Sequence, residues 1–162
     1  MPAIPNLQTT VNNSNSQLFG NYYGRTFVPF AQVDKANGYF RRIFVDSLTY
    51  SRMKAENLTP SDVPTGALIL METWFGSQSQ GTVFVRQRTQ QGWADGSFSP
   101  SSPNFLVSPN SSCQSCHQAA SPTDNMFTQP LLIKAIQRNK LQRIQCDRGQ
   151  TTPCDLSVYQ GN

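Results

Sequence analysis

The fold is decided by Gly66-Ala67-Leu68-Ile69-Leu70-Met71-Glu72-Thr73-Trp74-Phe75, the most apolar run in the chain. A short apolar run that opens on a glycine predicts a largely buried strand. Residues 76–81 suit a hairpin-like connection, and the alternating residues 82–88 predict the antiparallel partner of this strand. The centre of the chain is therefore expected to form an antiparallel sheet.

A further strand and a short helix are expected upstream of this hairpin. Residues 39–45 are rich in aromatic and β-branched side chains and follow Asn37-Gly38, a turn-forming pair, which is typical of a strand. Asp46 or Ser47 can then cap a short helix that runs to Lys54.

The second half of the chain is expected to be rich in loops and to end in a helix. Residues 90–112 contain three prolines and predict a loop. Residues 130–145 predict a helix, because Pro130 suits a first turn and the apolar residues form one stripe. The predicted fold class is α+β, a mainly antiparallel β-sheet with a C-terminal helix. Residues 1–17 are expected to form an extended polar arm, and residues 18–162 a single domain.

The charge and hydropathy of the chain exclude some classes of function. The 162 residues carry a formal net charge of +4, and the basic residues are dispersed without a long run. Such a distribution does not favour nucleic-acid binding. No stretch approaches the ~18–20 apolar residues that a membrane span needs, so no membrane span is expected.

The pentapeptide Cys113-Gln114-Ser115-Cys116-His117 predicts covalent attachment of one haem c. Two thiols three residues apart match the two vinyl groups of the porphyrin, and the following histidine can bind the iron. Cys113 and Cys116 are therefore expected to form the thioether bonds, with His117 as the proximal iron ligand. The alternatives are a zinc site, which wants a second Cys/His pair, and a redox dithiol, which wants a preceding strand.

His117 is the only histidine of the chain. A second histidine ligand from the same chain is therefore excluded. The sixth position of the iron must be taken by methionine, lysine, a weaker ligand, water or nothing. This choice limits the function more than the haem motif itself does.

The other two cysteines indicate an oxidising compartment. Cys146 and Cys154 are separated by seven residues rich in turn formers, so the two thiols can meet. A disulfide that closes such a loop stabilises by roughly 2–3 kcal/mol, and the alternative is two free thiols. Because c-type cytochromes are assembled outside the cytoplasm, a periplasmic or extracellular location is expected. Residues 1–17 lack the features of a signal peptide, so we expect that a leader has been removed.

Several segments of the chain between roughly residues 38 and 137 together carry a family resemblance: 45–50, 53–54, the strand after Gly66, 113–117, 123–128 and 131–132. They resemble the cytochrome P-460 and cytochrome c-prime-beta family. The resemblance implies a mostly antiparallel β fold, often dimeric, in which a C-terminal helical segment holds the haem against one sheet face. The resemblance also implies that the haem is bound by a loop, which carries the haem motif.

The family includes enzymes that oxidise hydroxylamine and proteins that bind nitric oxide or carbon monoxide. The enzymes carry a lysine on the second strand that cross-links to the porphyrin, and the resemblance puts Met71 at that position. Met71 is thereby expected to face the distal side of the haem and to bind the iron, which suits electron transfer. The alternatives are that Met71 is core packing, or that it overhangs an open iron that binds nitric oxide or oxidises hydroxylamine.

Other side chains are weaker candidates for contact with the haem. Arg86 and Arg88 alternate along one strand face and suit the haem propionates, although a solvated face is an equal alternative. No acid–base pair or nucleophile site is evident, so no catalytic residue is expected. The expected partner is a redox protein or a larger electron-transfer assembly, on which the arm 1–17 or the tail 146–162 can dock. Five residues can wall the haem or fill the core: Phe44, Leu70, Trp74, Phe84 and Trp93.

Overall fold

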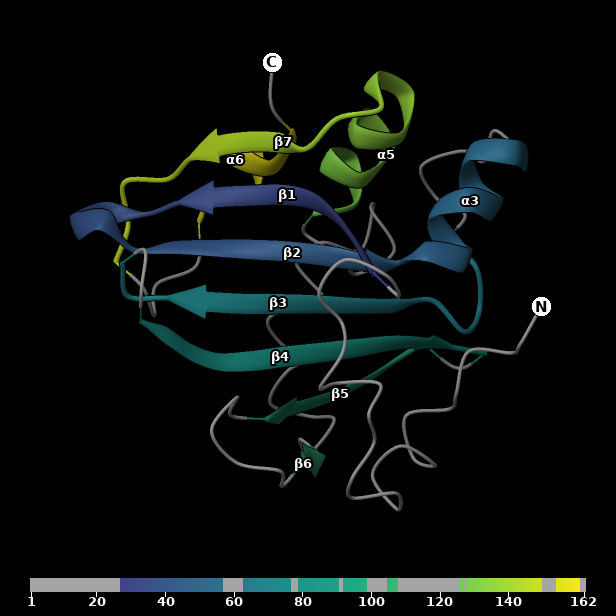
Figure 1. The fold of residues 1–162 in the computed structure, drawn as a ribbon, viewed down its shortest axis with the longest axis horizontal. Coiled ribbons are helices and arrows are strands. Elements are labelled where there is room, and N and C mark those ends of the chain that lie inside the picture. The colour runs from purple at the N-terminus through teal and green to yellow at the C-terminus, as the bar shows by residue number, and fades with distance from the viewer. Residues whose placement is uncertain are drawn as a thin grey trace.

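A computed structural model of the chain describes residues 27–56, 63–76, 79–90, 92–98, 105–107, 126, 128–149 and 154–160. Its described residues form one seven-stranded sheet with the strand order β6-β5-β4-β3-β2-β1-β7 (Figure 1). Neighbouring strands are antiparallel, except that β7 runs parallel to β1. The prediction of an α+β fold with a mainly antiparallel sheet is confirmed. The strands are β1 (Phe27–Asp34), β2 (Phe40–Asp46), β3 (Leu68–Trp74), β4 (Gln80–Thr89), β5 (Gly92–Phe98), β6 (Phe105–Val107) and β7 (Gln142–Gln145).

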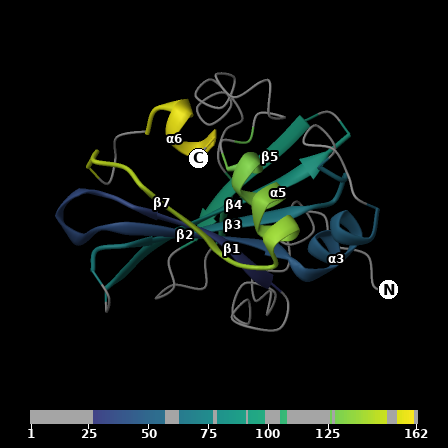
Figure 2. The ribbon, with the colours of Figure 1, turned by 90° about the horizontal axis from the view of Figure 1, so that it is seen from above.

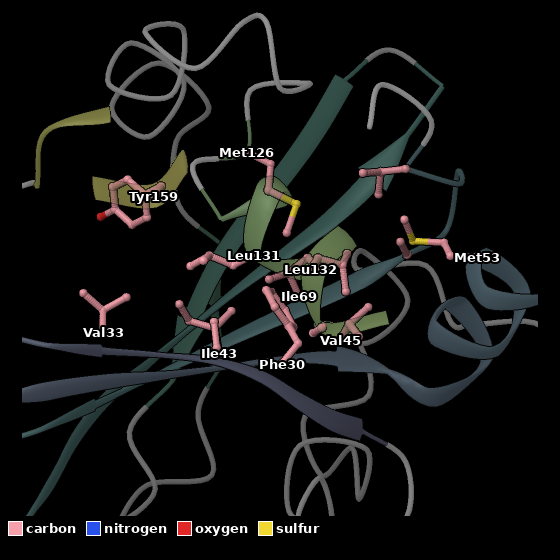
Figure 3. Packing of buried hydrophobic residues seen from close by; sticks show 14 of the residues in the cluster. Phe30, Val33, Ile43, Val45, Met53, Ile69, Met126, Leu131, Leu132 and Tyr159 are labelled. Atoms are coloured by element: carbon pink, nitrogen blue, oxygen red, sulfur yellow. The ribbon is translucent and has the colours of Figure 1, made fainter. Parts of the chain in front are cut away.

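Helices cover one face of this sheet, which we call the helical face (Figure 2). They are α3 (Ser47–Glu56), α5 (Gln129–Arg138) and α6 (Leu156–Gln160), whereas the 3-10 turn η2 (Ala36–Gly38) lies in the connection between β1 and β2. Side chains from α3, α5 and α6 join the inward residues of the strands in one buried cluster (Figure 3). The opposite face, which we call the second face, carries a separate cluster of Phe27, Phe44, Leu68, Leu70, Val83 and Val85.

Asp46 joins the start of α3 to the start of β3. Its Oδ2 accepts a hydrogen bond from the backbone N–H of Thr49 at 2.9 Å, and its Oδ1 accepts from the Thr49 hydroxyl at 2.7 Å. Oδ1 also accepts from the backbone N–H of Leu68 at 2.8 Å. Burial raises the pKa of Asp46, against the opposing effect of these hydrogen bonds. The predicted helix cap is confirmed and ties together two segments that are distant in sequence.

Three expectations about secondary structure are wrong or incomplete. Residues 90–112, predicted as a loop, contain β5 and β6. The helix predicted over 130–145 ends at Arg138, because Asn139 takes a left-handed conformation at φ 53°. The chain then forms β7 beside β1. β1 itself has no counterpart among the predicted elements.

The C-terminal segment is joined to the sheet by a disulfide between Cys146 and Cys154. Both cysteines are buried in the cluster of the helical face. The bond closes the short loop between β7 and α6, as the spacing of the two cysteines predicts.

Candidate functional site

The haem motif at 113–117 and the arm at 1–17 lie outside the described residues. The candidate site is therefore built from Met71 and the side chains that surround it on the sheet. Its position follows from the alternation of side chains along β3.

Met71 lies in the middle of β3, and its side chain lies on the helical face of the sheet. Its register partners are Ile43 on β2 and Phe84 on β4. Met71 is partly buried against the cluster of the helical face, whereas Phe84 is 42% exposed in the interior of the sheet. The thioether of Met71 therefore lies beside an exposed aromatic ring, at the centre of a rigid strand.

A guanidinium group contacts the sulfur of Met71. Nη1 of Arg41, on β2, lies 4.0 Å from Sδ of Met71, with the geometry of a weak hydrogen bond to sulfur. Arg41 is partly buried, and this burial lowers its pKa, while Tyr159 opposes the shift. We call Arg41, Met71 and Phe84 the Met71 patch.

A second cation lies close to the Met71 patch. Lys35, just after β1, is 4% exposed. Burial and the positive charge of Arg41 lower the pKa of Lys35 to about 8. Two cationic side chains thus interact within a poorly solvated part of the molecule, where charge is costly.

Arg86 and Trp93 lie on the same sheet face as Met71, one and two strands further along. Nε of Arg86 donates to Oδ1 of Asp95 at 2.6 Å, and the two side chains are 11% and 5% exposed. The guanidinium of Arg86 stacks over the Trp93 ring at 4.7 Å from its centroid, and that of Arg88 lies 5.9 Å away. The predicted shared face of Arg86 and Arg88 is confirmed. Arg86 is held in a buried ion pair that limits its reach.

Phe44 and Leu70 do not share a site with Met71, because strand alternation sends them to the second face. Trp74 stacks on Phe40, with centroids 5.6 Å apart. Glu72 points away from Met71 and is fully buried. Its carboxylate accepts from Nε1 of Trp74 at 3.1 Å and from Nε2 of Gln80 at 3.0 Å.

Met126 shows where the chain is nine residues after His117. Its side chain is 3% exposed and belongs to the cluster of the helical face, near Leu131 and Leu132 (Figure 3). Nine extended residues span at most about 30 Å. Met126 itself therefore lies on the face of the sheet that carries Met71.

The sequence did not single out Arg41 or Lys35 as site residues. The side chain of Arg41 lies on the same face of β2 as that of Ile43, which follows two residues later and is buried. This spacing could have indicated that Arg41 points toward the core. Lys35 follows β1, a strand that the sequence did not predict. Nothing in the sequence therefore indicated that Lys35 would be buried.

Two absences and the comparisons with known proteins bear on the class of protein. The described part of the chain contains no group of three or more His, Cys, Asp or Glu side chains that could hold a metal ion. None of the helices in those same residues is long and apolar enough to cross a membrane. Comparison with models of known protein families finds no match, and comparison with curated proteins finds none. The fold and the Met71 patch define an α+β domain with a partly buried methionine in contact with Arg41, near the buried Lys35.

Proposed function

We propose that the chain is a mono-haem c-type cytochrome that transfers electrons. Cys113 and Cys116 attach the haem, His117 is the proximal iron ligand, and the haem lies against the helical face at the Met71 patch. The observation that carries the proposal is the partly buried side chain of Met71, on the face whose cluster also contains Met126, nine residues after His117 in the sequence.

The residues of the Met71 patch fit such a group. A haem has a flat apolar ring with two carboxylates at one edge. Phe84 and Met71 offer apolar surface in the middle of the sheet, where burial is worth roughly 25 cal/mol per Å². Arg41 and Lys35 supply positive charge beside that surface, which suits the carboxylates. When bound, the haem would supply an iron that exchanges one electron.

The thioether of Met71 favours electron transfer over ligand binding. Because His117 is the only histidine, another donor would have to complete the ligands of the iron, and the sulfur of Met71 would favour the reduced iron and close it to small ligands. β3 is hydrogen-bonded to a neighbour on each side, so its backbone holds Met71 in place when the charge changes. Such rigidity suits rapid electron exchange.

The disulfide supports the proposed compartment. A Cys146–Cys154 bond persists in oxidising surroundings, so we place the protein in the periplasm or outside the cell. Its partner would be a redox protein or a larger electron-transfer assembly, and the family resemblance adds a homodimer as the form to test.

Substitution of Met71 tests the proposal. The chain is expressed in cells equipped for covalent haem attachment, and its absorption spectrum is compared with that of Met71→Ala. We expect a weak near-red charge-transfer band in the ferric wild type and its loss in Met71→Ala, together with new binding of carbon monoxide. Met53→Ala is the matched control, because Met53 is a buried methionine of the same cluster on α3. It should lower stability and leave the band intact.

A second candidate function is favoured by the contact between Arg41 and Met71. The hydrogen bond to Sδ engages the lone pairs that would bind iron. If Met71 stays off the iron, the haem has an open position with a guanidinium donor nearby, which suits binding of nitric oxide or oxidation of hydroxylamine. The methionine at the place of the family's cross-linking lysine disfavours the hydroxylamine reaction. Ready binding of carbon monoxide by the wild type, with a spectrum indifferent to Met71→Ala, would select this candidate.

A further inference from the structure

The three methionines that the structure describes differ in their surroundings. Met53 and Met126 are 2% and 3% exposed and lie inside the apolar cluster of the helical face (Figure 3). Met71 is only partly buried and packs against that cluster from the middle of β3. A small oxidant dissolved in water reaches a thioether more easily where the side chain has access to solvent. Of these three thioethers, that of Met71 is therefore the most open to oxidation.

Met71 also differs in having a cationic donor at its sulfur. Nη1 of Arg41 lies 4.0 Å from Sδ of Met71. The backbone of Arg41 is held on both sides, because it pairs with Val33 on β1 and with Thr73 on β3. This register sets Arg41 diagonally across from Met71, within reach of a long side chain. A guanidinium group stays protonated in proteins and can only donate hydrogen bonds. The sulfur of Met71 is therefore in contact with a donor that the sheet fixes in place.

This donor suits an oxidised sulfur better than a thioether. A thioether is only a weak acceptor, whereas oxidation to the sulfoxide makes the side chain polar and adds an oxygen that accepts hydrogen bonds. An oxygen bonded to Sδ and directed toward Nη1 can lie within the about 2.7–3.2 Å of an N–H···O hydrogen bond. We propose that Met71 is a site of oxidation to methionine sulfoxide and that Arg41 binds the sulfoxide oxygen.

The oxidant in this reaction is hydrogen peroxide. A lone pair of Sδ attacks one peroxide oxygen, and the S–O bond forms while the O–O bond breaks. The departing hydroxide takes the proton from the transferred oxygen and becomes water. The sulfur loses two electrons, and the peroxide gains them. The proposal does not rest on a haem, but oxidation and binding to iron would use the same lone pairs of Met71 and would therefore compete.

Peroxide treatment of the full chain tests the site itself. The chain is expressed in cells that do not attach haem, so that iron neither covers the sulfur nor reacts with the peroxide. It is treated with dilute hydrogen peroxide, and its peptides are analysed by mass spectrometry over time. We expect Met71 to gain one oxygen before Met53 and Met126 do. Oxidation of either buried methionine before Met71 would overturn the assignment of the site.

Glutamine substitutions test whether the surroundings of Met71 accept a polar oxygen. Glutamine resembles methionine sulfoxide in length and carries an acceptor oxygen. By urea unfolding, Met53→Gln should lower the folding equilibrium constant about tenfold or more relative to Met53→Leu, because it buries an amide in an apolar cluster. Met71→Gln should stay within about threefold of Met71→Leu, because Arg41 donates to the new oxygen. Each comparison with leucine cancels the loss of the sulfur.

The same comparison without Arg41 isolates the role of the guanidinium. In the Arg41→Leu background, Met71→Gln should become about tenfold less stable than Met71→Leu, because the amide oxygen has lost its donor. Arg52→Leu is the control background, since Arg52 is exposed on α3 and pairs with Glu56. It should leave the difference between glutamine and leucine at position 71 unchanged.

The outcomes decide the proposal independently of the haem. If glutamine is as costly at position 71 as at position 53, or if its cost at position 71 is the same with and without Arg41, the guanidinium does not bind the oxygen and the proposal is wrong. If Arg41→Leu does not fold, the comparison of positions 71 and 53 in the wild-type background decides alone. Absence of covalent haem would overturn the proposed function and leave this inference standing.

Discussion

The two faces of the sheet differ in the contacts that their buried polar and charged side chains make. The second face buries an apolar cluster, and its buried carboxylate, Glu72, is matched by donors from Trp74 and Gln80 on its own and the adjoining strand. The helical face holds Lys35 and Arg41 close together and places Arg41 on the sulfur of Met71.

This difference indicates where function resides. A face that serves packing alone gains nothing from buried cations, since desolvation of each charge is costly. Perturbed cationic groups of this kind cluster at functional sites, so we propose that the helical face is the binding face. The predictions below test this division between a packing face and a binding face.

The largest expected effect is loss of the haem itself. The double variant Cys113→Ala/Cys116→Ala should carry no covalent haem, because both thioether bonds are removed. Haem staining on a denaturing gel measures this. The control Cys146→Ala/Cys154→Ala should keep the haem and lose roughly 2–3 kcal/mol of stability with the disulfide. Equal haem loss in both double variants would contradict the assignment of the motif.

Removal of Asp95 should have the largest effect on stability at the helical face. Asp95→Ala leaves Arg86 charged and mostly buried, and breaking a buried ion pair costs about 3–5 kcal/mol. Urea unfolding measures the loss. The control is Asp34→Ala, since Asp34 pairs with the exposed Arg143 on β7 and exposed pairs contribute little. Similar losses in both variants would show that burial does not distinguish the two pairs.

Substitutions of Leu70 and Met71, which are adjacent on β3, should separate effects on packing from effects on haem binding. Leu70 is 0% exposed on the second face, so Leu70→Ala should cost about 2–5 kcal/mol and leave the haem spectrum unchanged. Met71→Ala removes a partly exposed side chain, so it should cost less stability and change the spectrum. Unfolding curves and absorption spectra of both variants test this, and a spectral change in Leu70→Ala would contradict the division between the faces.

The same division explains how much of the structure was predictable from the sequence. The strand β3, its partner β4 and the cap at Asp46 follow from local patterns of hydropathy and polar residues. β5 contains two glycines and an aspartate and exists because β4 pairs with it, which no local pattern reveals. β7 is likewise a short polar strand that forms beside β1.

The candidate site was also predictable only in part, namely where it depends on the pattern within one strand. Alternation along β3 correctly puts Met71 and Glu72 on opposite faces. The proximity of Arg41 and Lys35 to Met71 depends on the pairing of β1 with β2 and of β2 with β3, which brings residues together across strands. The haem and its attachment through 113–117 stay predictions from the sequence.

The smallest expected effect is a pH-dependent gain in stability when Lys35 is replaced. The pKa of Lys35 falls from 10.5 to about 8 in the folded protein. Between these values the unfolded chain binds more protons than the folded one, so stability of the haem-free wild type rises as pH increases from about 8 to about 10.5. Below pH 8 the charged amine carries its full penalty, and Lys35→Met should be more stable than the wild type there.

Unfolding at pH 7 and at pH 10.5 measures the gain and its disappearance. The gain should shrink in the haem-loaded protein, because a carboxylate of the haem close to Lys35 favours its charged form. Arg52→Met on the exposed surface of α3 is the control and should show no such pH dependence. A gain that is the same at both pH values would mean that Lys35 is not penalised as a buried charge, which would contradict its place in the division between the two faces.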